Sequence, residues 1–287
     1  MKKIKNTLAA LLVMGLGMGL VSSCQKAYDP KTYAPTKPLP TFGGYSNSKD
    51  IQPASLVAYW PFNGNLTDSI SSTAGVATGA TVGDGVKGKG LQGAANGYVV
   101  VNTPAAVKAL QSFTISTWVK MPQNTTGAIG IIGIAHTQNF WGNLDIFFDN
   151  GSTADKGVLK VHGFNNSTSA SGADAWEGGY SVANPWNTWI NISVTYDNAS
   201  STVTVYYNGA VAGTNTPGGF APLNWSGAQK MVFGTLQFQT TPSLTSATDA
   251  QGWAGYLTGQ MDQVRIYSKA LSSTEVSALY SLEKLGR

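Results

Sequence analysis

The chain has 287 residues, with 42% hydrophobic and 11% charged side chains, a composition that fits one large or two small domains. Its 34 glycines, with abundant Ser, Thr and Asn, favour strands and tight turns over helices. The formal charge is +4, but Lys2, Lys3 and Lys5 lie in a segment that we expect to be removed, which leaves fifteen basic against fourteen acidic residues. This near-neutral balance excludes the electrostatic footprint that nucleic-acid binding requires.

The first 24 residues have the three parts of an export signal. Three lysines precede an uncharged apolar run of 14 residues at positions 8–21, and small residues then lead to Cys24. As a helix this run would reach roughly 21 Å, short of a hydrocarbon core of ~30 Å. The pattern therefore predicts a cleaved signal peptide over residues 1–23 rather than a membrane-spanning helix.

The stretch Leu20-Val21-Ser22-Ser23-Cys24 resembles the lipobox of bacterial lipoproteins. In that family the cysteine thiol takes a diacylglycerol, the chain is cut before the cysteine, and the new amine is acylated. The resemblance implies that Cys24 anchors the protein in a lipid bilayer of the bacterial cell envelope, and we expect the outer membrane. The alternative is an ordinary secretory signal with an incidental cysteine. Cys24 is the only cysteine, which excludes an internal disulfide.

Residues 24–53 are predicted to form an extended tether behind the lipidated cysteine. Five prolines lie among them, at positions 30, 35, 38, 40 and 53, and no apolar period is sustained. Proline-rich segments of this kind act as semi-rigid spacers. We therefore expect the folded domain to occupy residues 54–287.

Short β-type segments separated by turn residues follow the tether. They lie at residues 56–62, 97–101, 113–119, 189–196, 203–207 and 259–268. In the clearest of them Ile190, Ile192 and Val194 alternate with polar residues, which is typical of a strand with one buried face. Asn208-Gly209 is a hairpin signal after the fifth segment. The fold class predicted is all-β, a two-sheet antiparallel sandwich.

A short C-terminal helix is predicted behind the last strand. Ser272 can cap it, and Glu275 three residues later completes a capping box. Val276, Leu279 and Tyr280 then form one apolar stripe, which we expect to face the sandwich.

Four stretches in series resemble the laminin-G-like, concanavalin A-like jelly-roll modules of bacterial surface proteins. They are residues 58–69, 112–120, 186–209 and 259–280, and the resemblance covers about residues 54–283. It implies a jelly roll that binds a glycan without catalysis, at the cell surface or in the periplasm. The alternative is a structural or adhesive lipoprotein that binds an envelope protein partner. A glycoside hydrolase is the less favoured third reading.

Catalytic groups are scarce in this sequence. The Glu-x-Asp-x-x-Glu strand of the glucanases that share such a sandwich is absent. Asp145 and Asp149 are the best remaining carboxylate pair, and they are interpreted as solvent-facing aspartates of a strand and turn. His136 and His162 are far apart in the sequence and have no cysteine partner, which argues against zinc. We therefore predict that the protein is not an enzyme.

Tryptophans in polar loops are the candidate ligand contacts. Trp60, Trp118 and Trp189 fall in predicted strands and are expected to be buried, whereas the other five lie in or beside loops. Trp141 and Trp176 are the leading candidates, because sugar faces stack on exposed rings while side-chain oxygens and amides bind hydroxyl groups. The polar partners expected beside them are Asn139, Asn143, Asp145 and Glu177. The alternative is that each loop ring is buried in a small satellite core.

A structural Ca²⁺ is also implied by the resemblance. In the family, the Asn/Asp turn after the first strand lies close to the aspartate of the closing strand. Asp68, Asp262 and Asn63 match those positions and would supply oxygen ligands together with nearby carbonyls. The alternative is that Asp68 only caps a turn and that Asp262 pairs with a basic side chain.

Overall fold

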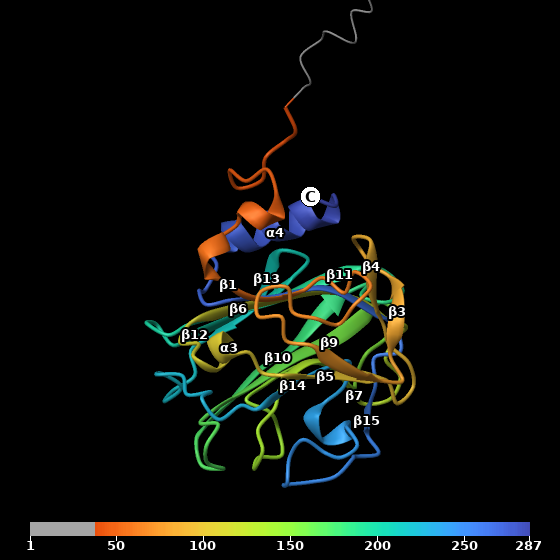
Figure 1. The fold of residues 1–287 in the computed structure, drawn as a ribbon, viewed down its shortest axis with the longest axis vertical. Coiled ribbons are helices and arrows are strands. Elements are labelled where there is room, and N and C mark those ends of the chain that lie inside the picture. Colours follow the sequence, from red (N-terminus) through yellow and green to blue (C-terminus); the bar gives the residue numbers. More distant parts are fainter. Residues whose placement is uncertain (1–37) are drawn as a thin grey trace, which may run out of the picture. The chain divides into compact units, whose positions relative to one another are not determined.

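The structure is a computed structural model that describes residues 38–287, so Cys24 and the predicted signal peptide lie outside the described residues. Residues Pro40–Arg287 form one compact unit. Within it, two eight-stranded sheets pack face to face, and a 12-residue helix follows the last strand (Figure 1). The predicted all-β sandwich with a short C-terminal helix is confirmed. No helix in residues 38–287 is both long enough and apolar enough to span a membrane.

The first sheet has the antiparallel strand order β13–β12–β11–β6–β16–β4–β3, and β1 also pairs with β16. Its strands are β1 (Leu56–Trp60), β3 (Thr81–Asp84), β4 (Lys89–Gln92), β6 (Phe113–Lys120), β11 (Ile190–Asp197), β12 (Thr202–Tyr207), β13 (Ala210–Asn215) and β16 (Gln260–Tyr267).

The second sheet has the antiparallel order β10–β9–β8–β7–β14–β5–β2, and the short β15 pairs in parallel with β7. Its strands are β2 (Gly75–Thr78), β5 (Tyr98–Asn102), β7 (Ala128–Ile134), β8 (Leu144–Asp149), β9 (Lys156–Asn165), β10 (Ala173–Ala183), β14 (Lys230–Phe233) and β15 (Ala254–Gly255). The short helices are η1 (Ser48–Asp50), η2 (Pro53–Ser55), α3 (Ala105–Lys108) and η3 (Gln237–Gln239).

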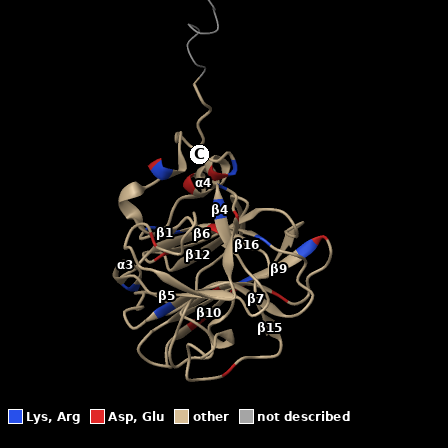
Figure 2. Ribbon diagram, turned by 45° about the vertical axis from the view of Figure 1, so that its right-hand side comes forward, with Lys and Arg blue, Asp and Glu red and all other residues tan. Residues whose placement is uncertain are grey.

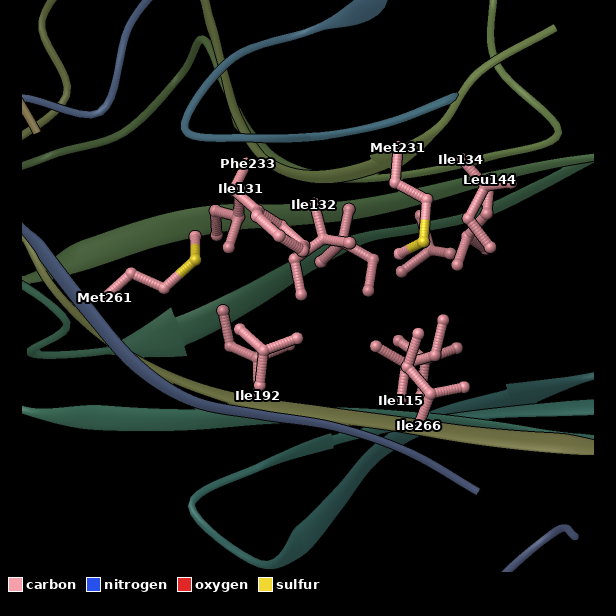
Figure 3. Packing of buried hydrophobic residues seen from close by; sticks show 14 of the residues in the cluster. Ile115, Ile131, Ile132, Ile134, Leu144, Ile192, Met231, Phe233, Met261 and Ile266 are labelled. Carbon is pink, nitrogen blue, oxygen red and sulfur yellow. The ribbon is translucent and has the colours of Figure 1, made fainter. Parts of the chain in front are cut away.

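The core lies between the two sheets (Figure 3). Ile115 and Ile192 reach into it from the first sheet, and Ile132 and Leu144 reach into it from the second. Each such side chain stabilises the fold by about 1.5–3 kcal/mol when it leaves water. The alternation predicted for residues 190–196 is confirmed, because its apolar members belong to this core. The outer face of each sheet lies opposite this core and is available for other contacts.

The helix α4 (Ser273–Lys284) covers the outer face of the first sheet. Its predicted capping box is present, because Ser272 and Glu275 bond each other's backbone N–H groups. The Trp118 ring stacks on Tyr280 at 5.4 Å, and its indole N–H donates to the Glu283 carboxylate at 2.7 Å. Glu283 also pairs with Arg265 at 2.6 Å, and both side chains are buried. The predicted stripe of Val276, Leu279 and Tyr280 therefore does face the sandwich.

The segment before the first strand packs beside α4 instead of remaining extended. Ile51 is buried with the apolar residues of α4, and Phe42 and Tyr45 pack against the same cluster. Arg287 donates to the Pro40 carbonyl at 2.8 Å. The compact unit therefore begins at Pro40, inside the stretch 24–53 that the prolines predict to be tether. In Figure 1 this segment lies on the α4 side of the sandwich, and β15 lies on the other side.

Candidate functional site

The outer face of the second sheet carries a row of large polar and aromatic side chains. The strand register places Asp145 of β8 opposite His162 of β9, and His162 opposite Trp176 of β10. Their chain neighbours Ile146 and Val161 point into the core. Because side chains alternate along a strand, the row points away from the core.

Seven rings gather around this row, and we call them the aromatic face. Trp141, from the loop between β7 and β8, packs edge-on against Trp176 with ring centroids 5.0 Å apart. It also stacks on Phe147 at 5.4 Å and lies 6.0 Å from Trp253, which directly precedes β15. The aromatic face consists of Phe140, Trp141, Phe147, His162, Trp176, Phe238 and Trp253.

Two rings of the aromatic face are open to solvent. Trp176 and Trp253 are each 44% exposed, whereas Phe147 and Phe238 are buried beneath them. Trp141 is half-buried between these two layers. The exposed rings therefore rest on a packed floor, which limits the freedom that they would lose on binding a ligand.

A chain of hydrogen bonds runs beneath Trp176. The buried His162 ring contacts Asp145 at 3.3 Å through Nδ1 and Asp174 at 2.5 Å through Nε2. The second oxygen of Asp174 accepts the indole N–H of Trp176 at 3.1 Å. Asp145 also accepts the backbone N–H of Gly142 at 2.7 Å. This series of hydrogen bonds thus joins the buried Asp145 carboxylate to the exposed Trp176 ring.

Each charged group in this series of hydrogen bonds favours the charged form of its neighbour. Burial disfavours the charged His162 ring, but the hydrogen bonds and charges of Asp145 and Asp174 outweigh it and raise the pKa of His162 above its ordinary value. In return, the hydrogen bond from His162 lowers the pKa of the Asp174 carboxyl, whose side chain is 52% exposed. Asp174 is therefore an ionised group at the edge of the aromatic face.

The structure brings three of the six predicted ligand residues together, namely Trp141, Trp176 and Asp145. Asp145 is not the solvent-facing aspartate expected, because it is buried against His162. Asp149, its suggested partner, pairs with Lys160 at 2.6 Å. The two aspartates therefore do not act as a free carboxylate pair.

The other three predicted ligand residues make hydrogen bonds within the fold. Glu177 is adjacent to Trp176 in the strand, so its side chain points to the opposite face. There it is 3% exposed and accepts a hydrogen bond from the Asn215 amide at 2.9 Å. Burial raises the pKa of its carboxyl. Asn143 is buried and donates to the Phe164 carbonyl at 2.9 Å. Asn139 is half-buried, and its side-chain oxygen accepts the N–H of Phe140 at 3.0 Å within the loop that holds Trp141.

His162, Asp174 and Trp253 belong to the site but were not predicted for it. The spacing of Asp174 and Trp176, two residues apart in one strand, does indicate a shared face. Nothing in the sequence pairs His162 with Asp145, because that contact depends on strand register. Of the other tryptophans, Trp186 and Trp225 are buried in the main core, Trp60 and Trp118 are buried as predicted, and Trp189 is only half-buried.

The oxygen atoms of the predicted calcium ligands already accept hydrogen bonds from backbone N–H groups. Asp68 caps its own turn, accepting the N–H groups of Tyr59 at 2.7 Å and Ser71 at 3.0 Å. Asp262 accepts the N–H of Lys87 at 3.0 Å, and burial raises the pKa of its carboxyl to about 6.

Asn63 accepts the N–H of Lys89 at 2.9 Å, so Asn63 and Asp262 meet at the same β3–β4 turn. Over residues 38–287 no group of three or more His, Cys, Asp or Glu side chains could hold a metal ion. Calcium binding through Asp68, Asp262 and Asn63 stays a prediction.

Solved structures share this fold. Domain 4 of AbnA, a GH43 extracellular arabinanase from Geobacillus stearothermophilus in complex with arabinotriose, is 20% identical, with a TM-score of 0.53 over 78% of this chain and 98% of that one. The binding domain of Paraclostridial Mosquitocidal Protein 1 is 17% identical, with a TM-score of 0.58 over 82% of this chain and 52% of that one.

The binding domain of Botulinum neurotoxin DC, in complex with rat synaptotagmin II, is 15% identical, with a TM-score of 0.55 over 81% of this chain and 52% of that one. The chain thus spans about half the length of either toxin domain. No curated protein matches the sequence. Residues 92–277, more than half of the chain, match the family described as the Concanavalin A-like lectin/glucanases superfamily. The chain belongs to that superfamily.

Proposed function

We propose that this protein is a non-catalytic, lipid-anchored protein of the cell envelope that binds carbohydrate at the aromatic face. The observation that carries the proposal is the pair of exposed rings, Trp176 and Trp253, above a packed aromatic floor. A large apolar ring exposed to water is unfavourable unless it has a partner. The apolar C–H face of a sugar ring is such a partner, and Asp174 beside Trp176 can accept hydrogen bonds from the hydroxyl groups of the sugar.

The charge around the aromatic face favours neutral sugars over acidic ones. Asp174 is half-exposed and negative, the His162 ring is fully buried, and Lys160 is paired with Asp149. An anionic sugar would meet the Asp174 carboxylate, whereas the nearby cations His162 and Lys160 already pair with aspartates. Figure 2 also shows charges scattered singly over the described ribbon, without a continuous basic stretch.

The comparisons support binding in general. One relative of the fold was solved with arabinotriose, and another, the binding domain of Botulinum neurotoxin DC, was solved both with SialylT and with synaptotagmin. The second candidate partner is therefore a protein. A protein partner would need a broad apolar patch of several hundred Å², whereas the aromatic face combines two exposed rings with a carboxylate.

The proposed anchor is Cys24, which lies outside the described residues. Pro40 to Ile51 pack beside α4, on the side of the sandwich away from β15 (Figure 1). The first residues of the compact unit, from Pro40, therefore lie on the side away from the aromatic face. Cys24→Ala should leave an unprocessed or soluble product, and mass spectrometry should find acyl chains on Cys24 in the wild-type membrane fraction. An unmodified mature Cys24 would contradict the anchor.

The binding proposal is tested by a glycan array on the purified protein, followed by titration of the best neutral glycan. Trp176→Ala and Trp253→Ala should each weaken binding about tenfold or more, which corresponds to about 1.4 kcal/mol. Val76→Ala is the matched control, because Val76 is also highly exposed but lies on the edge strand β2 at the far end of the sheet. Binding that survives both tryptophan variants, or an array that shows no neutral glycan, would refute the proposal.

A further inference from the structure

His162 occupies a place that no ligand can reach. Its side chain is 0% exposed, and its ring lies 4.5 Å from Trp176 and 5.7 Å from Trp141. It therefore acts through the side chains that it touches. The last of these before solvent is Asp174, which holds the indole N–H of Trp176.

Both ring nitrogens of His162 face a carboxylate, Asp145 on one side and Asp174 on the other. Only the protonated ring has two N–H groups and can donate to both. A neutral ring has one N–H, so its bare nitrogen would face the other carboxylate. One of the two contacts must then weaken.

The contact that weakens should be the one to Asp174. Asp145 is buried, and its Oδ1 already lacks a hydrogen-bond partner, so losing the His162 donor as well would leave it poorly compensated. Asp174 is half-exposed and can turn to water instead. When it turns, Trp176 loses the acceptor that fixes its ring.

The other groups around His162 do not compete for this role. Asp145 comes from β8 and Asp174 from β10, and Lys160 of its own strand is paired with Asp149. From β7, the residue opposite Asp145 is Gly133, which has no side chain. The two carboxylates together raise the pKa of His162, so the charged clamp persists to a higher pH than an ordinary imidazolium would.

We propose that His162 is a positioning residue: as an imidazolium clamped between Asp145 and Asp174, it fixes the ring of Trp176 for ligand binding and releases that ring as the pH rises. The consequence for the ligand rests on the proposed function, whereas the consequence for Trp176 does not.

The test is therefore made first without ligand. Indole N–H resonances are followed by NMR between pH 5.5 and pH 9, assigned with Trp176→Phe. The Trp176 resonance should move in one step that coincides with the titration of the His162 ring. In His162→Gln the step should disappear. A Trp176 resonance that stays constant in the wild type would overturn the proposal, whatever the protein binds.

Asp174→Asn is the second variant, at a half-exposed position that tolerates change. It keeps an acceptor for Trp176 but removes one carboxylate, so the step should move to lower pH; an unchanged midpoint would contradict the clamp. The Trp176 step should persist in the control variant His136→Gln, because His136 contacts the backbone carbonyls of Asn166 and Ser169 rather than a carboxylate.

Glycan binding is measured last, at pH 6 and pH 9. The wild type should bind at least fivefold more weakly at pH 9, and His162→Gln should show less than a twofold difference. Equal wild-type affinity at both pH values would overturn the role in binding. Failure to bind at either pH, with the Trp176 step intact, would refute the proposed function and leave the clamp itself supported.

Discussion

The outer faces of the two sheets carry the same arrangement of side chains, which we call a device. In each, a tryptophan indole N–H donates to a carboxylate that also binds a buried basic side chain. On the first sheet the Trp118 indole donates to Glu283, a carboxylate that also binds the buried Arg265. On the second sheet the Trp176 indole donates to Asp174, a carboxylate that also binds the buried His162. Helix α4 covers the first device, whereas the second stays open, with Trp176 44% exposed. The same contact therefore holds a helix in one place and presents a ring to solvent in the other.

The largest effect is expected where the covered device is broken. Glu283→Ala leaves Arg265 buried without its partner and removes the acceptor of Trp118. Loss of one member of a buried ion pair destabilises by about 3–5 kcal/mol. Urea unfolding measures this, with the exposed neighbour Lys284→Ala as a control that should change stability by less than about 0.5 kcal/mol. Unchanged stability in Glu283→Ala would mean that the pair does not hold α4.

The two tryptophans should separate in stability. Trp118→Ala removes a ring that is fully covered, so the free energy of unfolding should fall by about 3–5 kcal/mol. Trp176→Ala removes a half-exposed ring and should cost about 1 kcal/mol or less. Trp141→Ala should fall between them, since Trp141 packs against several rings. Equal losses at Trp118 and Trp176 would show that the aromatic face is core.

Calcium should have a smaller effect, and on neither device. If Asp68 and Asp262 bind the ion together with Asn63, calcium at ten times its Kd should stabilise the protein by roughly 1.4 kcal/mol. Calorimetry with calcium and then with chelator measures it, and Asp262→Asn should abolish the difference. Identical melting temperatures with and without calcium would remove the predicted site.

The smallest effect concerns pH and the open device alone. The folded-state pKa of His162 is raised above 6.5, so its protonated ring stabilises the fold fully below that pH. The contribution is lost as the pH rises through the folded-state value. Unfolding free energies at pH 6 and pH 9 should therefore differ more in the wild type than in His162→Gln. An equal difference in both proteins would place the pH dependence elsewhere.

Residue patterns predicted the fold better than the site. The alternation of Ile190, Ile192 and Val194 and the capping box of Ser272 and Glu275 are local, so the sequence shows them directly. The order of the strands depends on contacts between distant segments, and no spacing reports it. Strand β7 was not predicted, because it is apolar on both faces and lacks a clear alternation.

Within the site, composition indicated Trp141, Trp176 and Asp145 but not the contacts that link them. Trp141 and Trp176 were identified because large rings are unusual in polar loops. Glu177 was misplaced because its neighbour Trp176 was assumed to share its face, whereas adjacent strand residues point in opposite directions. His162 was considered only as a metal ligand, because its contacts with Asp145 and Asp174 come from strand register.

One measurement tests the central claim directly, since it observes both devices at once. The indole N–H resonances of all the tryptophans are recorded while a neutral oligosaccharide that binds in the array is titrated into the wild-type protein. Trp176 and Trp253 should shift with the same saturation curve, and Trp118 beneath α4 should stay unchanged. Shifts at tryptophans outside the aromatic face, with Trp141, Trp176 and Trp253 unaffected, would place the binding site elsewhere and contradict the account.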